Sequence, residues 1–136
     1  MIAFDDIVPT GLAASGNTVY MAEAGAVPHL PENGKVVSFG MLSPTATLVA
    51  SGARLLVDVE FGPDHRLYAL AQGVWNGLGE GSSALPNTGS LVKVNKNGTF
   101  TVITDGLDRP TSLEFIENTA YVVTLTGEIW KMEVEN

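Results

Sequence analysis

Hydrophobic and polar positions alternate in short runs that repeat three times along this chain. Each copy opens with a strand-like run, at residues 9–14, 56–61 and 110–115. A tight polar turn and a second run marked by tyrosine follow, at residues 19–20, 67–68 and 120–121. Short alternating runs joined by tight turns are typical of β-hairpins. The pattern therefore predicts three copies of one hairpin.

Each hairpin precedes a third run that begins with glycine, at residues 34–39, 89–94 and 127–132. A fourth run follows in the first two copies, at residues 46–52 and 100–106, and the third copy reaches Asn136 before one. The copies start at residues 9, 56 and 110, so their spacings of 47 and 54 residues suit four-stranded propeller blades. Helical periodicity is absent. We predict an all-β chain of three such blades, half of a six-bladed β-propeller.

We treat residues 1–136 as a single half-propeller domain. Its expected parts are an exchanged outer strand (1–8), blade 1 (9–55), blade 2 (56–109) and blade 3 without its outer strand (110–136). Residues 2–8 precede Pro9 much as residues 102–109 precede Pro110, so they resemble the outer strand of a preceding blade.

Three blades cannot close a ring, because propellers use about four to eight. We therefore expect a homodimer in which the N-terminal strand of each chain completes the third blade of the other. The alternative is that the chain is a fragment of a longer protein.

Composition narrows the function classes. The chain has 7 basic and 15 acidic residues, a formal net charge of −8, and no clustered Lys and Arg. This balance argues against nucleic acid and against an anionic membrane surface as partners. The absence of cysteine excludes disulfides and thiolate sites. The first residues do not resemble a signal peptide, so we expect a cytoplasmic chain as written, or an exported one if a precursor exists.

Several repeat motifs resemble the ScyD/ScyE family of propellers, within the wider NHL and gluconolactonase-like superfamily. The similar segments are residues 9–12, 61–68, 88–94, 95–103 and the insert Trp75-Asn76-Gly77-Leu78. The resemblance covers nearly the whole chain and about the C-terminal half of a full-length member. It implies a six-bladed propeller, while the biochemical role of the family is poorly defined.

Two long loops after the second strands hold the candidate chemistry. They span residues 22–33 and 71–88, and loops of this length are commonly functional. We expect both loops on one face, around the mouth of the channel. The candidate ligand-binding residues are Glu23, His29, Asp58, Trp75 and Asn76.

Each candidate also has a structural interpretation. Trp75 is either a stacking platform or a plug that folds its loop back on the blade. Glu23 and Asp58 could ligate calcium, since superfamily relatives hold a channel metal, or they are solvated or hydrogen-bonded carboxylates. Asp58 matches Gly11 and Ser112 on the inner strands, which places it toward the channel or against backbone amides.

We therefore expect a non-catalytic binding module that forms a homodimer and binds a small molecule or protein on its long-loop face. We expect no obligatory cofactor. The alternatives are a metal-dependent hydrolase of the lactonase type and a module that serves only assembly. A thermal shift by calcium, reversed by a chelator, separates the hydrolase from the binding module.

Overall fold

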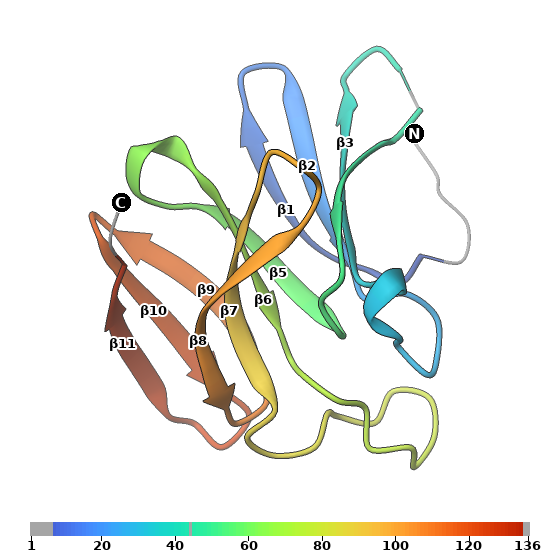
Figure 1. Cartoon of the computed structure of the whole chain (residues 1–136), viewed down its shortest axis with the longest axis vertical. Coiled ribbons are helices and arrows are strands. Elements are labelled where there is room, and N and C mark those ends of the chain that lie inside the picture. Colours follow the sequence, from blue (N-terminus) through green and yellow to red (C-terminus); the bar gives the residue numbers. More distant parts are fainter. Residues whose placement is uncertain (1–6, 44, 135–136) are drawn as a thin grey trace.

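The computed structural model describes residues 7–43 and 45–134, which form three separate antiparallel sheets (Figure 1). The strands of this part are β1 (Pro9–Ser15), β2 (Thr18–Glu23), β3 (Lys35–Gly40), β4 (Thr47–Ser51), β5 (Leu56–Phe61), β6 (Leu67–Ala71), β7 (Gly89–Val94), β8 (Phe100–Leu107), β9 (Pro110–Ile116), β10 (Thr119–Thr124) and β11 (Ile129–Glu133). Two single-turn 3-10 helices, η1 (Pro31–Asn33) and η2 (Pro63–His65), lie in connections. No helix of the described residues is long and apolar enough to cross a membrane.

Each sheet is a meander, as expected for a propeller blade. Blade 1 has the strand order β1-β2-β3-β4, blade 2 has β5-β6-β7-β8, and blade 3 has β9-β10-β11 among the described residues. The first strand of blade 2, β5, contacts both β1 and β9, so the three inner strands lie side by side. This confirms the predicted fold class. Residues 1–6, which hold most of the predicted exchanged strand, lie outside the described residues.

The three blades share one hydrogen-bonding register. Successive strands align matching rows of side chains, and we name a row forward when it faces the next blade and backward when it faces the preceding one. The forward rows are Gly11–Ala22–Val36, Asp58–Leu70–Leu91 and Ser112–Val123–Ile129. The backward rows are Leu12–Met21–Val37, Val59–Ala69–Val92 and Leu113–Val122–Trp130.

The core lies between the blades. One cluster joins Ala22 and Val36 of the first forward row to the backward row of blade 2. A second cluster joins Leu70 and Leu91 of the next forward row to Leu113 and Val122 of blade 3. Where a blade is covered on both faces, apolar residues occupy both sides of its strands, as in β6, all five residues of which are buried.

The start of each blade has a matching backbone conformation. The residue before each inner strand has a positive φ, at Val8 (49°), Leu55 (53°) and Arg109 (48°). Its carbonyl accepts a hydrogen bond from the residue after the second strand, at 2.9 Å from Ala24, 2.8 Å from Gln72 and 3.1 Å from Leu125. A register shift follows in each inner strand, and the bulged residues are Thr10, Val57 and Thr111. These shared bends bring the ends of the second strands to one end of the molecule.

Candidate functional site

Both long loops leave the same end of the molecule, as predicted. In Figure 1 the loop that contains η1 and the loop between β6 and β7 lie together at the lower end, and the β10–β11 turn is short. An isolated bridge between Trp75 and Ala84 folds the second loop on itself. The buried polar side chains gather near this long-loop end, and in the described residues they are Glu23, His29, Gln72 and Thr124.

A cavity of about 550 Å³ opens at the long-loop end. It reaches the ends of all three blades, because Val8 just before β1, Leu55 just before β5 and Leu125 in the β10–β11 turn all line it. The remaining lining residues are Thr10, Ala24, Ala26, Val27, His29, Gln72, Glu80, Gly81, Ser82 and Ser83. A concave site of this size with a few polar groups in an apolar wall is typical of small-molecule binding.

His29 is the predicted residue that the structure places in this cavity wall. Its side chain is buried, and its Nδ1 lies 3.4 Å from the carbonyl oxygen of Ala24. The tautomer with a proton on Nδ1 donates to this carbonyl and leaves Nε2 as an acceptor. The imidazole also meets the Trp75 ring edge to face, with 5.9 Å between ring centroids.

Gln72 is a cavity residue that was not among the predicted site residues. Its Oε1 accepts a 2.9 Å hydrogen bond from the Ala84 amide, and its Nε2 donates to the Pro110 carbonyl at 3.5 Å. The oxygen and the nitrogen of the Gln72 side-chain amide thus connect the long loop of blade 2 to the inner strand of blade 3. In the sequence, Gln72 is distinguished only as a polar residue that directly follows an apolar strand.

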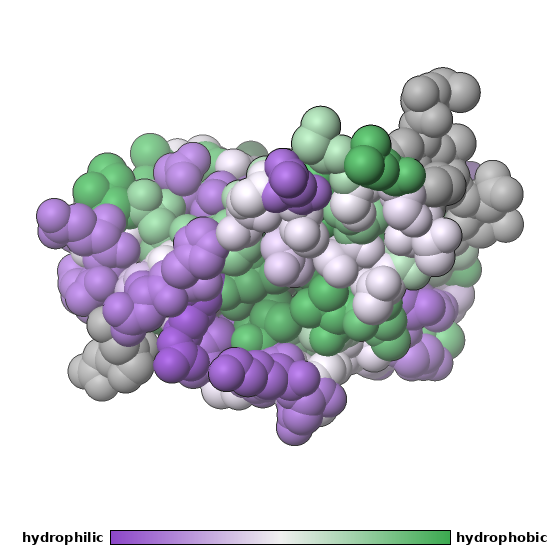
Figure 2. Space-filling model, turned by 90° about the horizontal axis from the view of Figure 1, so that it is seen from above, coloured by the Kyte–Doolittle hydropathy of each residue, from purple (hydrophilic) through white to green (hydrophobic). Residues whose placement is uncertain are grey.

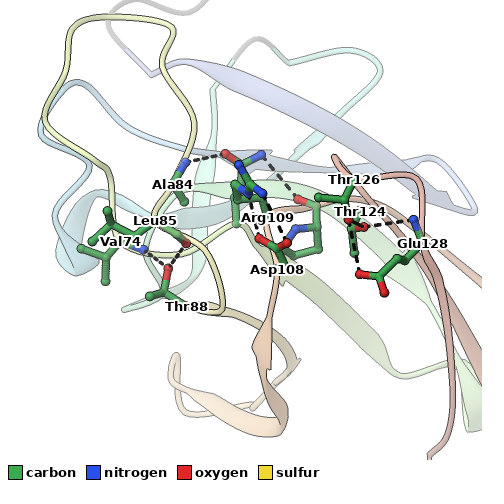
Figure 3. A network of polar contacts seen from close by, with 11 residues as sticks. Val74, Ala84, Leu85, Thr88, Asp108, Arg109, Thr124, Thr126 and Glu128 are labelled. Atoms are coloured by element: carbon green, nitrogen blue, oxygen red, sulfur yellow. Dashed lines mark hydrogen bonds and ion pairs between the residues drawn. The ribbon is translucent and has the colours of Figure 1, made fainter.

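The second loop is held by further polar contacts (Figure 3). The Thr88 hydroxyl accepts from the Val74 amide at 3.0 Å and donates to the Leu85 carbonyl at 2.7 Å. Nearby, Arg109 and Asp108 form an ion pair of 2.7 Å. This hydrogen bond with Arg109 lowers the pKa of Asp108. The base of the loop is therefore fixed by its own side chains.

Trp75 and Asn76 lie in this loop but are not among the residues that line the cavity. The Trp75 indole donates to the Ser82 hydroxyl at 2.9 Å and packs near Ala84. The Asn76 Oδ1 accepts from the Leu78 amide and from the Ser82 hydroxyl, both at 2.8 Å. These contacts match the interpretation of Trp75 as a plug that folds the loop back.

Glu23 is the last residue of β2, whereas the sequence pattern had placed it at the start of the loop. It is buried, and it lines a separate cavity of about 140 Å³ together with Asn33 and Lys35. Burial raises the pKa of Glu23, and the charge of Lys35 offsets part of this rise. Glu23 is thus a partly desolvated carboxylate beside a cation.

Asp58 lies between the inner strands of blades 2 and 3. Its Oδ1 accepts from the Val59 amide and its Oδ2 from the Leu113 amide, each at 2.9 Å. Burial raises the pKa of Asp58, these two hydrogen bonds lower it, and the charge of Glu114 raises it further. Gly11 leaves room for the carboxylate, since a Cβ there would lie 2.8 Å from Oδ1. Asp58 therefore caps backbone amides, one of the two predicted roles.

The structure does not bring the predicted metal candidates together. Glu23 and Asp58 belong to different surroundings, and neither is among the lining residues of the cavity at His29. Among the described residues, no group of three or more His, Cys, Asp or Glu side chains is placed to hold a metal ion.

The opposite end, formed by the tight turns, carries a hollow of about 720 Å³ between blades 1 and 2. Figure 2 looks onto this end and shows hydrophobic surface in the middle of the view, with hydrophilic surface along part of its border. Here the Ser15 hydroxyl lies 2.8 Å from His65 Nε2, and the imidazole stacks on Phe61 with centroids 4.3 Å apart. His65 is the last residue of η2, in the turn between β5 and β6.

Comparisons with known proteins add three structures with little sequence identity. No protein-family model matches the chain, and no curated protein matches it in sequence. The computationally designed Ika4 protein is 18% identical with a TM-score of 0.46, and the match covers 99% of this chain and 96% of that one. The computationally designed Ika8 protein is 17% identical with a TM-score of 0.40, covering 93% and 46%. A streptogramin B lyase is 13% identical with a TM-score of 0.41, covering 99% and 43%.

The chain thus spans less than half the length of the Ika8 protein and of the lyase. The assignment of blades rests on the sheets and rows described above.

Proposed function

We propose that this chain is a non-catalytic binding module that holds a small molecule in the cavity at its long-loop end. The observation that supports this function is the 550 Å³ cavity with the buried His29 in its wall. The cavity lies on segments that the blades hold in place, which is the usual setting of a binding site on a rigid scaffold.

The chemistry of the wall suggests the class of ligand. Several polar lining groups are already paired within the protein: the Thr10 hydroxyl donates to the Leu56 carbonyl, the Gln72 amide is used at both ends, and the Ser82 hydroxyl bonds within its loop. His29 Nε2 remains as an acceptor that a ligand can use, with the Glu80 carboxylate and the Ser83 hydroxyl in the same wall. The ligand is a mainly apolar molecule that carries a hydrogen-bond donor, and the negative charge of Glu80 disfavours an anion.

Phenol is a simple probe of this class, and two-dimensional NMR can follow its binding. We expect phenol to shift amide signals of residues 24–29 and 80–84, and benzoate to shift them less. The His29→Phe variant retains an aromatic ring beside Trp75 but removes the acceptor, so its affinity for phenol should fall several-fold. The matched control His65→Phe changes the turn end and should bind phenol normally. Absence of phenol shifts at the loops in the wild-type protein would refute the proposal.

The proposal includes two copies in a closed six-bladed ring and membership of the ScyD/ScyE-like propellers. The exchange of residues 1–8 onto the third blade of the partner is part of this assembly. Among the described residues β11 has no fourth strand beside it, so its outer edge is available for pairing. The Phe4→Lys variant should weaken the dimer without unfolding the blades, and an unchanged dimer would refute the exchange.

The lactonase alternative has its own test. Calcium should leave the thermal unfolding temperature unchanged if the module is not a metal-dependent hydrolase. A rise in that temperature that a chelator reverses would favour the hydrolase.

A further inference from the structure

Blade 3 presents a forward row that has no later blade of the chain to cover it. Val36 and Leu91 hold the outermost position of the forward rows in blades 1 and 2, and both are 0% exposed. Their counterpart in blade 3, Ile129, is 71% exposed. All three side chains are aliphatic, so the difference comes from the surroundings of Ile129: among the described residues β11 has neither a following blade nor a fourth strand beside it. The forward face of blade 3 is therefore built like a buried face.

Blade 1 shows the complementary difference on its backward face. Val59 and Leu113 hold the inner-strand position of the backward rows in blades 2 and 3, and they are 0% and 2% exposed. Their counterpart Leu12 is 63% exposed. Leu12 therefore lacks the cover that the preceding blade gives to Val59 and Leu113, whereas Met21 and Val37 in the same row are buried in one copy, at 5% and 6% exposed.

The two junctions inside the chain show what each face fits. At the first junction Val36 and Val59 belong to one buried cluster, and at the second Leu91 and Leu113 belong to one buried cluster. A forward row therefore always packs on a backward row. By the same register, Ile129 requires a row that begins with Leu12, but blade 2 separates blade 1 from blade 3 within one chain.

We infer that the forward face of blade 3 packs on the backward face of blade 1 of a second copy of this chain. Two such seams, Ile129 against Leu12 in both directions, close a ring of six blades, within the range that propellers use. This inference rests on the ring assembly in the proposed function and specifies its contact surface. Each copy contributes the forward face of its blade 3 to one seam and the backward face of its blade 1 to the other, so the contact is head to tail.

Light scattering on a sizing column tests this surface. The wild-type protein should have twice the chain mass of 14.3 kDa. The Leu12→Lys and Ile129→Glu variants should each shift to the mass of one chain, because each seam then buries an unpaired charge. Both side chains are largely exposed in one copy, so circular dichroism of each variant should retain the β-sheet spectrum.

Two control variants change apolar residues that lie outside the rows and are exposed to a similar or greater degree than Leu12 and Ile129. Leu78→Glu lies in the second long loop and Met41→Lys in the turn after β3, and their side chains are 85% and 70% exposed. Both variants should keep the mass of two chains. Loss of the dimer in the control variants as well would overturn the assignment of the surface.

Mixing the two seam variants tests the head-to-tail pairing. In a mixed pair one seam is fully wild-type, and the other contains both the Lys and the Glu, so the mass of two chains should return. A wild-type monomer, an assembly of three or more copies, or no recovery on mixing would each overturn the inference. Phenol titration of the monomeric Leu12→Lys variant separates the two proposals: retained binding with a failed mixing experiment leaves the cavity intact and rejects only the seam.

Discussion

Replacement of Asp58 by asparagine tests how the inner strands are joined. The carboxylate accepts one backbone N–H with each oxygen, from Val59 and from Leu113 of the next blade. Asparagine has one acceptor oxygen and one NH₂ group, so one of the two amides would face a donor. The Asp58→Asn variant therefore loses one partly buried hydrogen bond, either to Leu113 of the next blade or to Val59 within β5.

The expected cost follows from the loss of this bond. Leaving a buried backbone N–H unpaired costs about 2 kcal/mol of unfolding free energy. At about 4 °C per kcal/mol for a chain of this size, the thermal midpoint should fall by roughly 8 °C. Scanning calorimetry at one fixed protein concentration measures this, because the midpoint of an oligomer depends on concentration. The matched control Asp64→Asn, in an exposed turn with a positive φ of 56°, should change the midpoint little.

The pH dependence provides a second measurement of the same variant. Burial raises the pKa of Asp58 in the folded protein, so the folded state holds this proton more tightly than the unfolded state. The associated stabilisation is fully present below the unfolded pKa of about 3.9 and is lost as pH rises through the folded pKa. The variant does not titrate at this position, so its stability deficit should grow as pH falls from about 7 to about 4. An equal midpoint in both proteins, or a deficit that shrinks toward acid pH, would refute this account of Asp58.

Two further substitutions test the packing. Tyr68 is fully buried, and its hydroxyl has no hydrogen-bond partner in the part of the chain that the structure describes. The Tyr68→Phe variant should therefore stabilise the fold by about 1 kcal/mol. The control Tyr20→Phe changes a half-buried residue and should not stabilise the fold. Chemical unfolding measures both, and a destabilised Tyr68→Phe protein would show that the hydroxyl is paired. A Cβ at Gly34 would overlap the Ala53 carbonyl oxygen, so Gly34→Ala should lower the free energy of unfolding by about 3 kcal/mol. The control Gly40→Ala places a Cβ in open space and should lower it far less. Equal losses in the two variants would contradict this packing.

Much of the fold was predictable because the same strand–turn–strand pattern recurs in each blade. Tyr20, Tyr68 and Tyr121 mark the same strand in each blade, and the alternation around them gives the strand positions to within a few residues. The conformation that starts each blade was not predictable, because Val8, Leu55 and Arg109 share no side-chain property. At all three positions the positive φ accompanies a hydrogen bond from the residue after the second strand of the same blade, so the conformation belongs to the blade geometry and not to a residue type.

The candidate site was predictable only in part. The lengths of the loops indicated the end of the molecule at which the cavity opens, and His29 lies in the wall of that cavity. Gln72 and Asn76 are similar polar residues in the same loop, yet Gln72 reaches the cavity and Asn76 braces its own turn. The distinction depends on how the loop folds back through the Trp75–Ala84 bridge, which residue type alone does not encode.

The short turn of blade 3 has a consequence for engineering. Blades 1 and 2 carry their long loops between the same two strands that blade 3 joins across residues 125–128, and the rows on either side keep one register in all three blades. Blade 3 therefore shows that a blade of this type forms without a long loop. We expect that other loops can be grafted between β2 and β3 or between β6 and β7 while the strands keep their register.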